Sequence, residues 1–384
     1  MKFRPWAWAI SLCLALGAIH PAGAQTSSPE KTLRYAFRVA ETGFDPAKIQ
    51  DLYSRVVTPH IFEALVGYDH LARPAKLKPL TTTELPTPSE DFKVTLLGTG
   101  VPNPRPERFS QSTLVEAGSQ KLVFDLGRGV TIRLWQLKVP MGRIDAHFIT
   151  HFHSDHLTGL PDLWLTGWLR PPYGQRQKPF LIYGPPGTKR LMEGLQTAFA
   201  DDIKIRLVDE QNPPAGIAVE AREFDAPAVV YERDGVKVTS FVVDHGDVIK
   251  PAVGYRIDYD GRSVVISGDT RLTEEIVRQG KGVDLLIHEV AAIDPKLLAR
   301  SPAFQRIFAH HVSPEQAGTV FARAQPRLAV YSHIARYEDP QTPAPNDADI
   351  VRETRKTYAG PLAVGVDLMQ FDVGAKGIAI SVVQ

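Results

Sequence analysis

The sequence is poor in several features that would each define a class of protein. Its 384 residues contain one cysteine, Cys13, which excludes an internal disulfide and a scaffold built on disulfides. The charges nearly balance, with 44 Lys and Arg against 43 Asp and Glu, so there is no basic excess of the kind that polyanion binders usually show. With 43% apolar residues, the composition is instead that of a globular protein with a substantial core.

The N-terminus has the pattern of a secretory signal peptide. Lys2 and Arg4 precede an apolar stretch at residues 6–19, and residues 22–24 offer a small-x-small cleavage site. The apolar stretch is short for a bilayer span, which favours a cleaved signal over an uncleaved anchor. Cleavage after residue 24 would remove Cys13 and change the formal net charge from +1 to about −1. We therefore expect a periplasmic or secreted protein that has no thiolate ligand and no membrane segment after cleavage.

Beyond the signal at residues 1–24, we expect an N-terminal extension with a linker at 25–90 and a main domain at 91–384. The extension should contain a strand near residues 32–39 and a helix at about 52–65, followed by a loop and the Thr- and Pro-rich linker. Its sequence resembles the start of peptide-type solute-binding proteins of ABC transporters. Such proteins need several hundred residues for their two lobes, so this short match implies no transport function.

From residue 92 onward, short β-rich runs alternate with stretches that are compatible with helices. The runs are bounded by Gly, Asp or His and lie at residues 94–97, 122–126, 146–150, 238–243, 263–267 and 285–288. Helices are predicted near residues 129–138, 159–169, 187–200, 272–279, 314–324 and 347–357. This alternation indicates an α/β domain.

The most informative stretch is residues 150–156, THFHSDH, which follows an apolar run directly. His151 and His153 lie two residues apart, so an extended loop at a strand end directs both imidazoles toward one point. Asp155 and His156 follow where the chain turns and can face a second metal. Imidazole and carboxylate are the zinc ligands that remain without cysteine. Burying these groups unpaired would be costly, which favours a shared metal over ordinary core histidines.

Further candidate ligands follow other apolar runs downstream. His245 comes after a run that ends at residue 243, and His333 comes after one at residues 328–331. Asp269 follows a third run, and Gly268 before it lets the backbone turn. Each of these would be weak evidence alone, but their order after the H-x-H-x-D-H motif makes them support one another.

Together these motifs resemble the metallo-β-lactamase superfamily across residues 92–384, and within it the ribonuclease Z branch and its exported relatives. The further matching motifs are GTG at residues 98–100, FDLG at 124–127, SGDT at 267–270, HE at 288–289 and SH at 332–333. The resemblance implies an α/β fold, namely a four-layer αββα sandwich, here with an N-terminal extension. It also implies a dinuclear zinc site where the loop edges of the two sheets meet.

The resemblance assigns seven metal ligands and a reaction. The first zinc ion would be held by His151, His153 and His245, the second by Asp155, His156 and His333, and Asp269 would bridge both. A hydroxide bridging two zinc ions per chain would attack a small phosphate or sulfate ester, because paired divalent ions activate water and stabilise developing negative charge. Asp155 would serve as ligand and as proton acceptor.

The resemblance also suggests residues that support the reaction. His311 would be the general acid, oriented by Glu289. A helix cap at Ser313 and Pro314 is compatible with that role. Asp125 would orient a ligand histidine, or would only cap the turn that follows it.

Arg336 and Tyr337 would bind the anionic substrate, with a surface salt bridge as the alternative for Arg336. Three further histidines are expected to be mainly structural: His147, His288 and His310.

Two departures bear on the substrate. The ribonuclease Z branch carries a long arm for transfer RNA, whereas only a short segment separates His245 from Asp269 here. With the near-neutral charge, this predicts a small-molecule anionic ester as partner and makes nucleic acid unlikely. The oligomeric state stays open, with a homodimer as one alternative. Alternatives are lactone or β-lactam hydrolysis, RNA 3′ processing of the ribonuclease Z type and, outside enzymes, a periplasmic ligand-binding protein. Asp269 argues against a dedicated β-lactamase.

Overall fold

The computed structural model describes residues 66–69, 76–79 and 91–383. The chain divides into two compact units, Met1–Leu85 and Pro86–Gln384. In the first unit, β1 (Val66–Asp69) and β2 (Lys76–Pro79) form an antiparallel pair, whereas we expected a loop there. The predicted signal peptide, the strand and helix of the extension and the linker lie outside the described residues.

The first sheet of the second unit has eight strands in the order β17-β16-β3-β4-β5-β6-β7-β8. Their bounds are β3 (Phe92–Gly98), β4 (Ser112–Ala117), β5 (Gln120–Phe124), β6 (Ala146–Phe148), β7 (Phe180–Gly184), β8 (Val219–Glu223), β16 (Met369–Val373) and β17 (Ile378–Val382). β5, β6, β7 and β8 run parallel, and the remaining pairings are antiparallel. β3 is buried along nearly its whole length because both of its faces are covered.

The second sheet has seven strands in the order β15-β14-β13-β12-β11-β10-β9. Their bounds are β9 (Ala228–Arg233), β10 (Val236–Val242), β11 (Val253–Tyr259), β12 (Arg262–Ile266), β13 (Leu285–Ala292), β14 (Leu328–Arg336) and β15 (Leu362–Val364). β12, β13, β14 and β15 run parallel. β11 and β12 form a hairpin that turns at Asp260 and Gly261, and both residues have positive φ.

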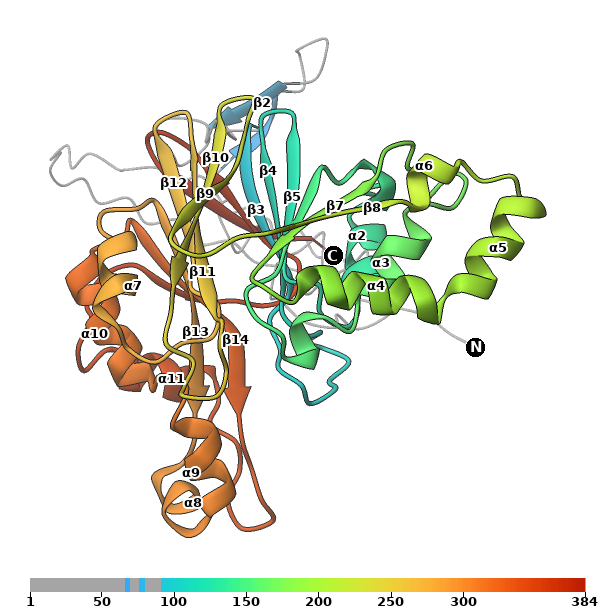
Figure 1. Cartoon of the computed structure of the whole chain (residues 1–384). Coiled ribbons are helices and arrows are strands. Elements are labelled where there is room, and N and C mark those ends of the chain that lie inside the picture. Colours follow the sequence, from blue (N-terminus) through green and yellow to red (C-terminus); the bar gives the residue numbers. More distant parts are fainter. Residues whose placement is uncertain (1–65, 70–75, 80–90, 384) are drawn as a thin grey trace, which may run out of the picture. The chain divides into compact units, whose positions relative to one another are not determined.

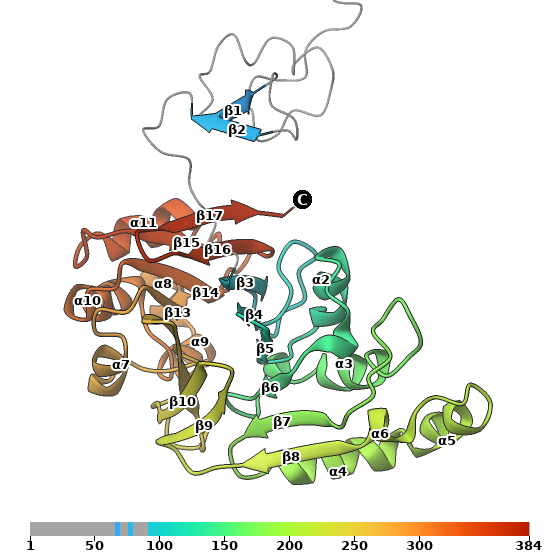
Figure 2. The same ribbon diagram turned by 90° about the horizontal axis from the view of Figure 1, so that it is seen from above.

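Helices cover the outer faces of both sheets, as Figures 1 and 2 show. On the side of the first sheet lie α2 (Val130–Gln136), α3 (Leu160–Thr166), α4 (Thr188–Ala198), α5 (Ala200–Val208) and α6 (Pro214–Ile217). On the side of the second lie α7 (Glu274–Gln279), α10 (Pro314–Ala324) and α11 (Asp347–Thr354). Two short 3₁₀ turns are η1 (Met141–Arg143) and η2 (Ser154–His156). The predicted four-layer αββα sandwich is confirmed.

Three apolar clusters fill the spaces between these layers. The cluster between the sheets contains Phe124, Phe148 and Tyr255, whose rings pack within 5.6 Å of one another. A second cluster joins α7, α10 and α11 to one sheet, and a third joins α2, α3 and α4 to the other. Burial on both faces of each sheet explains why the strand runs in the sequence are nearly continuous rather than alternating.

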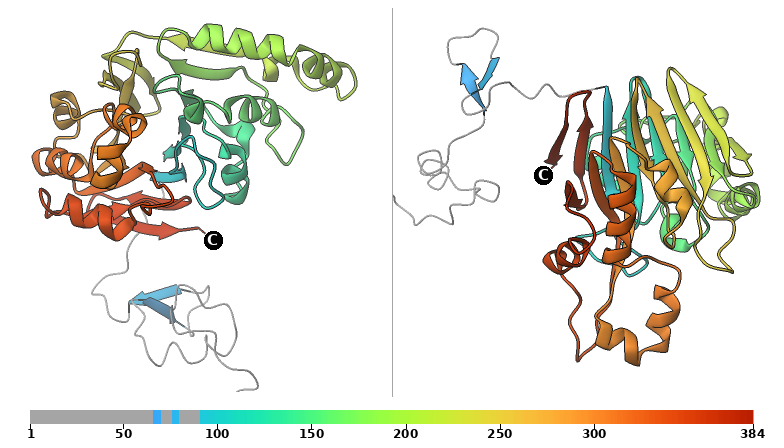
Figure 3. Two further views of the ribbon diagram at one scale, coloured as in Figure 1. Left: turned by 90° about the horizontal axis from the view of Figure 1, so that it is seen from below. Right: turned by 90° about the vertical axis from the view of Figure 1, so that its left-hand side faces the viewer.

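The six predicted helices of the main domain are present, but four other helices were not predicted. They are α5 and α6, together with α8 (Pro295–Arg300) and α9 (Pro302–Phe308), which project beyond the sheets in Figure 3. α5 and α9 bury no residue and α8 buries only Leu297, so these segments lack the apolar periodicity that reveals a helix. Among the described helices, none is long and apolar enough to cross a membrane.

Candidate metal centre

The H-x-H-x-D-H motif lies where β6 ends. β6 pairs in parallel with β5 and β7, so its carboxyl end opens onto the edge of the sheet. The chain runs on through His151 and His153 and then tightens into η2, which carries Asp155 and His156. His151, Asp155 and His156 are buried, as expected of side chains that converge on one point.

Three imidazoles form the first half of the cluster. The Nδ1 atom of His153 lies 3.0 Å from Nε2 of His151 and 3.3 Å from Nε2 of His245. His245 follows β10, and its Nδ1 atom donates to the carbonyl oxygen of His310 at 2.9 Å, which turns Nε2 toward the cluster. These residues are the three that we assigned to the first metal.

A carboxylate and two imidazoles form the second half. The Oδ2 atom of Asp155 lies 3.1 Å from Nε2 of His333 and 3.6 Å from Nε2 of His156. His333 reaches the cluster from β14, which is far from the motif in sequence. These residues are the three that we assigned to the second metal.

Asp269 lies between the two halves. Its Oδ2 atom is close to Nε2 of four histidines, at 3.3 Å from His333, 3.4 Å from His156, 3.6 Å from His245 and 3.8 Å from His151. Gly268 before it has a φ of 62°, and a Cβ atom there would lie 2.6 Å from the Val253 carbonyl oxygen. Only glycine therefore fits the turn that places Asp269 between the two halves.

Asp125 supports the cluster through hydrogen bonds to His156 and Thr150. Its carboxylate accepts a hydrogen bond from Nδ1 of His156 at 2.8 Å and from the backbone N–H of Thr150 at 2.9 Å. The Thr150 hydroxyl also donates to Asp125 and lies 3.0 Å from Nδ1 of His151. Asp125 thus orients a candidate ligand, which was the first of our two expectations, whereas the contribution of Thr150 was not predicted.

The electrostatics suit ligands rather than free titrating groups. Burial lowers the pKa of His151 well below its usual value and that of His245 to about 3, so both imidazoles are neutral. Burial opposes the charge on Asp269, but the nearby His333 and His156 outweigh it and hold the pKa of Asp269 well below its usual range. Neutral imidazoles and ionised carboxylates are the forms that bind metals.

His156 also shows that the cluster attracts a cation. Burial acts to lower the pKa of His156, yet the carboxylates of Asp269, Asp125 and Asp155 raise it well above its usual value. The field that retains a proton on this imidazole would equally stabilise a divalent ion beside it. Among the described residues, the buried atoms His156 Nε2 and Asp269 Oδ1 have no hydrogen-bond partner. The residues therefore fit a pair of divalent metal ions.

His311 lies next to this cluster and pairs with Glu289. Its Nδ1 atom is 3.0 Å from Oε1 of Glu289, an oxygen that also accepts from the backbone N–H of Thr270 at 3.2 Å. Burial disfavours the charged imidazole, but Glu289 outweighs burial and raises the pKa of His311 to about 9. One ligand atom of His311 also lies within 4.8 Å of those of Asp269 and His333. Its role as an acid rather than a ligand stays a prediction.

The segment after His311 forms the predicted helix cap. The Ser313 hydroxyl accepts from the backbone N–H of Gln316, and the Gln316 side chain accepts from the backbone N–H of Ser313. Pro314 occupies the first turn of α10. This capping box fixes the backbone immediately beyond His311 and is compatible with a role of its imidazole in the reaction.

Arg336 and Tyr337 lie at the end of β14, just beyond His333. Arg336 forms a salt bridge with Asp347, which was the alternative that we left open for it. Together with Arg105 and Arg108 it also lines a cavity of about 160 Å³. The Tyr337 ring packs 5.0 Å from that of Phe304. Burial, and then the carboxylates of the cluster, raise the pKa of Tyr337 to about 12, so its phenol is a hydrogen-bond donor at neutral pH.

The three histidines that we expect to be mainly structural differ in their distance from the cluster. His147 stacks on Phe180 with ring centroids 3.9 Å apart, and His288 packs edge-on against Phe321. His310 is closer, since its ring centroid lies 4.9 Å from that of His245. His147 and His288 make structural contacts, as expected, whereas the carbonyl oxygen of His310 orients a candidate ligand.

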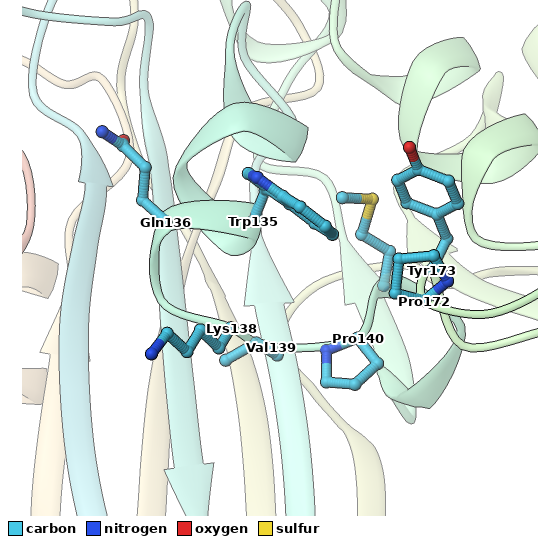
Figure 4. Close-up of a pocket in the computed structure, with 8 residues that line it drawn as sticks. Trp135, Gln136, Lys138, Val139, Pro140, Pro172 and Tyr173 are labelled. Carbon is cyan, nitrogen blue, oxygen red and sulfur yellow. The ribbon is translucent and has the colours of Figure 1, made fainter.

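A cavity of about 520 Å³ contains none of the candidate ligands (Figure 4). It is an apolar surface groove beside α2, lined by Trp135, Gln136, Lys138, Val139, Pro140, Met141, Pro172 and Tyr173. Polar groups that could perform chemistry do not converge on it. The metal cluster, not this groove, is therefore the candidate active site.

Known proteins are similar to this chain in sequence. Residues 123–334 match the Beta-lactamase superfamily domain. The ribonuclease Z of Mycobacterium avium (strain 104) is 35% identical over 285 residues, which are 74% of this chain and 99% of that protein. The ribonuclease Z of Mycobacterium marinum (strain ATCC BAA-535 / M) is 31% identical over 285 residues, 74% of this chain and 100% of that protein.

Solved structures show the same fold. The short form of human tRNase Z superposes with a TM-score of 0.54 at 22% identity, covering 73% of this chain and 99% of that one. A metallo-β-lactamase fold protein of Bacillus subtilis gives a TM-score of 0.53 at 17% identity, and the match covers 72% of this chain and 96% of that one.

Our expectation that nucleic acid is an unlikely partner is wrong, because the matching relatives are ribonucleases. Net charge misled us because it sums over the whole chain and does not report how charges are distributed over the surface. The short segment between His245 and Asp269 does not exclude an RNA substrate either. The alignment spans nearly all of the Mycobacterium avium enzyme with about as many residues of this chain, which leaves no room for a long extra arm in that relative.

Proposed function

The chain belongs to the metallo-β-lactamase superfamily, as a ribonuclease Z-like metal-dependent hydrolase, and on this premise we propose that it hydrolyses phosphodiester bonds at a dinuclear zinc centre. The observation that carries the proposal is the position of Asp269 Oδ2, within 3.8 Å of imidazole nitrogens from both halves of the cluster. A carboxylate so placed suits two metal ions that share a ligand.

Seven side chains would hold the metal ions. His151, His153 and His245 would hold one, Asp155, His156 and His333 the other, and Asp269 both. When bound, paired divalent ions supply a water of lowered pKa and stabilise negative charge on the phosphoryl oxygens. Asp155, one of the side chains that would hold the metal ions, would also act as the proton acceptor in the reaction.

His311 would donate the proton that the leaving oxygen needs. A general acid must carry its proton at working pH, and Glu289 keeps the pKa of His311 at about 9, above neutrality. The bond of 3.0 Å to Glu289 fixes Nδ1 and leaves Nε2 to face the leaving group. His311, held in place by Glu289, would thus serve as the proton donor in this reaction.

The substrate that we propose to test first is RNA with a 3′ extension, since the relatives are ribonucleases. Arg105, Arg108 and Arg336 line a cavity beside β14, and guanidinium groups suit phosphate oxygens. Small phosphodiesters contain the same reacting group and should be hydrolysed by the same residues. A sulfate ester is the further candidate that the sequence raised.

A substrate panel tests the proposal. The zinc-loaded chain would be assayed on precursor transfer RNA, a bis(4-nitrophenyl) phosphate, an aryl sulfate, a lactone and a β-lactam. We expect cleavage of the RNA and of the phosphodiester, and loss of both in His151→Ala. Turnover confined to the lactone or the β-lactam would refute phosphodiester hydrolysis. The variant His147→Phe, in which the histidine lies apart from the cluster, is the matched control.

A further inference from the structure

His333 has a backbone conformation that residues with a Cβ atom seldom adopt. Its φ is 46°, in the left-handed region, which is unfavourable for a residue other than glycine. The pairing of β13 with β14 also shifts register here, between His288 and Val290. Such a conformation persists only where the surrounding structure holds it.

The hydrogen bond that holds it comes from the other sheet. The backbone N–H of Ile334, the residue after His333, donates to the carbonyl oxygen of Thr99 at 2.9 Å. Thr99 follows β3 and is fully buried. The position of Thr99 therefore determines where the β14 backbone bends as it presents the imidazole of His333.

A buried carboxylate holds Thr99, and Arg108 also donates to the Thr99 hydroxyl at 2.8 Å. The Oδ1 atom of Asp367 accepts from the backbone N–H of Thr99 at 2.9 Å and from its hydroxyl at 2.8 Å. The other oxygen, Oδ2, accepts from the backbone N–H of Phe109 at 2.7 Å and from Arg133 at 2.9 and 3.2 Å. Asp367 is only 8% exposed and lies in the connection between β15 and β16.

We propose that Asp367 is a positioning residue for the second metal position, acting through Thr99 and Ile334 on His333. The proposal rests on the dinuclear centre proposed above. It assigns a function to a residue that touches none of the candidate ligands and that lies 34 positions after His333 in the chain. The first position, held by His151, His153 and His245, has no part in this chain of hydrogen bonds.

Loss of the carboxylate has a direct structural consequence. Without Asp367, the buried N–H and hydroxyl of Thr99 lose the acceptor that fixes them. Thr99 can then shift, its bond from Ile334 weakens, and His333 can relax toward negative φ. Relaxation rotates the imidazole away from Asp155 and Asp269, which it now approaches at 3.1 and 3.3 Å.

The test is a zinc titration of the metal-free full chain, with a chromophoric chelator as competitor. We expect wild type to bind two zinc ions and Asp367→Ala to bind one of the two about 10–100-fold less tightly, as seen when outer partners of metal ligands are removed. Asp367→Asn keeps an oxygen that can accept a hydrogen bond from Thr99, so its loss of zinc affinity should be smaller. If Asp367→Ala does not fold, Thr99→Val, which removes one donor, should still weaken one zinc ion selectively.

Asp284 offers a matched control. It is 9% exposed, accepts from the backbone N–H of Ser263 at 2.8 Å and pairs with Arg327, but it lies at the opposite, strand-starting end of β12 and β13. Asp284→Ala should lower stability and leave both zinc affinities unchanged. Unchanged zinc affinities in Asp367→Ala, or an equal loss in the Asp284 variant, would overturn the proposal. A wild-type chain that binds only one zinc ion would instead refute the dinuclear centre, before any variant is compared.

Discussion

Replacement of His311 by alanine should separate proton donation from metal binding. The imidazole is 7% exposed and its pKa is raised to about 9 by Glu289, so it is protonated at pH 7.5. Loss of a general acid of this kind costs about 10²–10⁴-fold in rate, or about 3–5 kcal/mol of transition-state stabilisation. His311→Ala should therefore cleave RNA about 10²–10⁴-fold more slowly and keep the zinc content of wild type.

The choice of leaving group gives the experiment its specificity. A 4-nitrophenolate departs without a proton, so the same variant should lose less than about tenfold on a 4-nitrophenyl phosphodiester. Glu289→Gln removes the charge that raises the pKa of His311. Even at an ordinary pKa of about 6.5, only about a tenth of the imidazole would stay protonated at pH 7.5. That variant should therefore lose about tenfold or more on RNA at pH 7.5, and regain rate as the pH is lowered.

The pH profile supplies an independent readout. An acid with a pKa of about 9 loses its proton as the pH rises through 9, so wild-type cleavage of RNA should decline above that pH. His311→Ala should lack this decline. Loss of zinc from His311→Ala would show that His311 is a metal ligand. An equal loss of rate on both substrates would refute proton donation. His147→Phe controls for the removal of a buried histidine elsewhere.

Three further predictions follow from the geometry. Asp269→Ala should bind less than one zinc ion per chain by metal analysis, and one tightly held ion would refute a shared ligand. Asp125→Asn should weaken zinc binding about 10–100-fold, since it disturbs the orientation of His156, whereas unchanged affinity would leave it only a turn-capping role. Burial lowers the pKa of His147 to about 3, so the unfolded chain binds the extra proton and stability falls as the pH drops below about 6.5, by about 1.4 kcal/mol per pH unit. Urea unfolding at pH 7 and pH 5 should show a smaller pH dependence for His147→Phe, and an equal dependence would contradict the assignment.

The sequence alone determined the features that local chemistry encodes. The H-x-H-x-D-H motif predicted four of the converging side chains because residues at the end of one strand share one loop. The six helices with an apolar stripe, such as α10 with its Ser313 cap, were predicted because burial and capping leave a periodic pattern. Positions after apolar runs indicated the more distant candidates His245, Asp269 and His333, and the resemblance to a superfamily assigned them to a metal site. The signal peptide stays a prediction.

Only the tertiary structure decided which distant groups act together. No local pattern links Asp367 to Thr99, which lies 268 residues away, or pairs Arg336 with Asp347. Net charge likewise could not show that Arg105, Arg108 and Arg336 line one cavity together with Glu107. The physical reason is that hydrogen bonds and Coulomb forces at these sites depend on separations of a few ångströms. Those separations are set by how the two sheets pack and where their strands end, and the order of residues along the chain does not contain them.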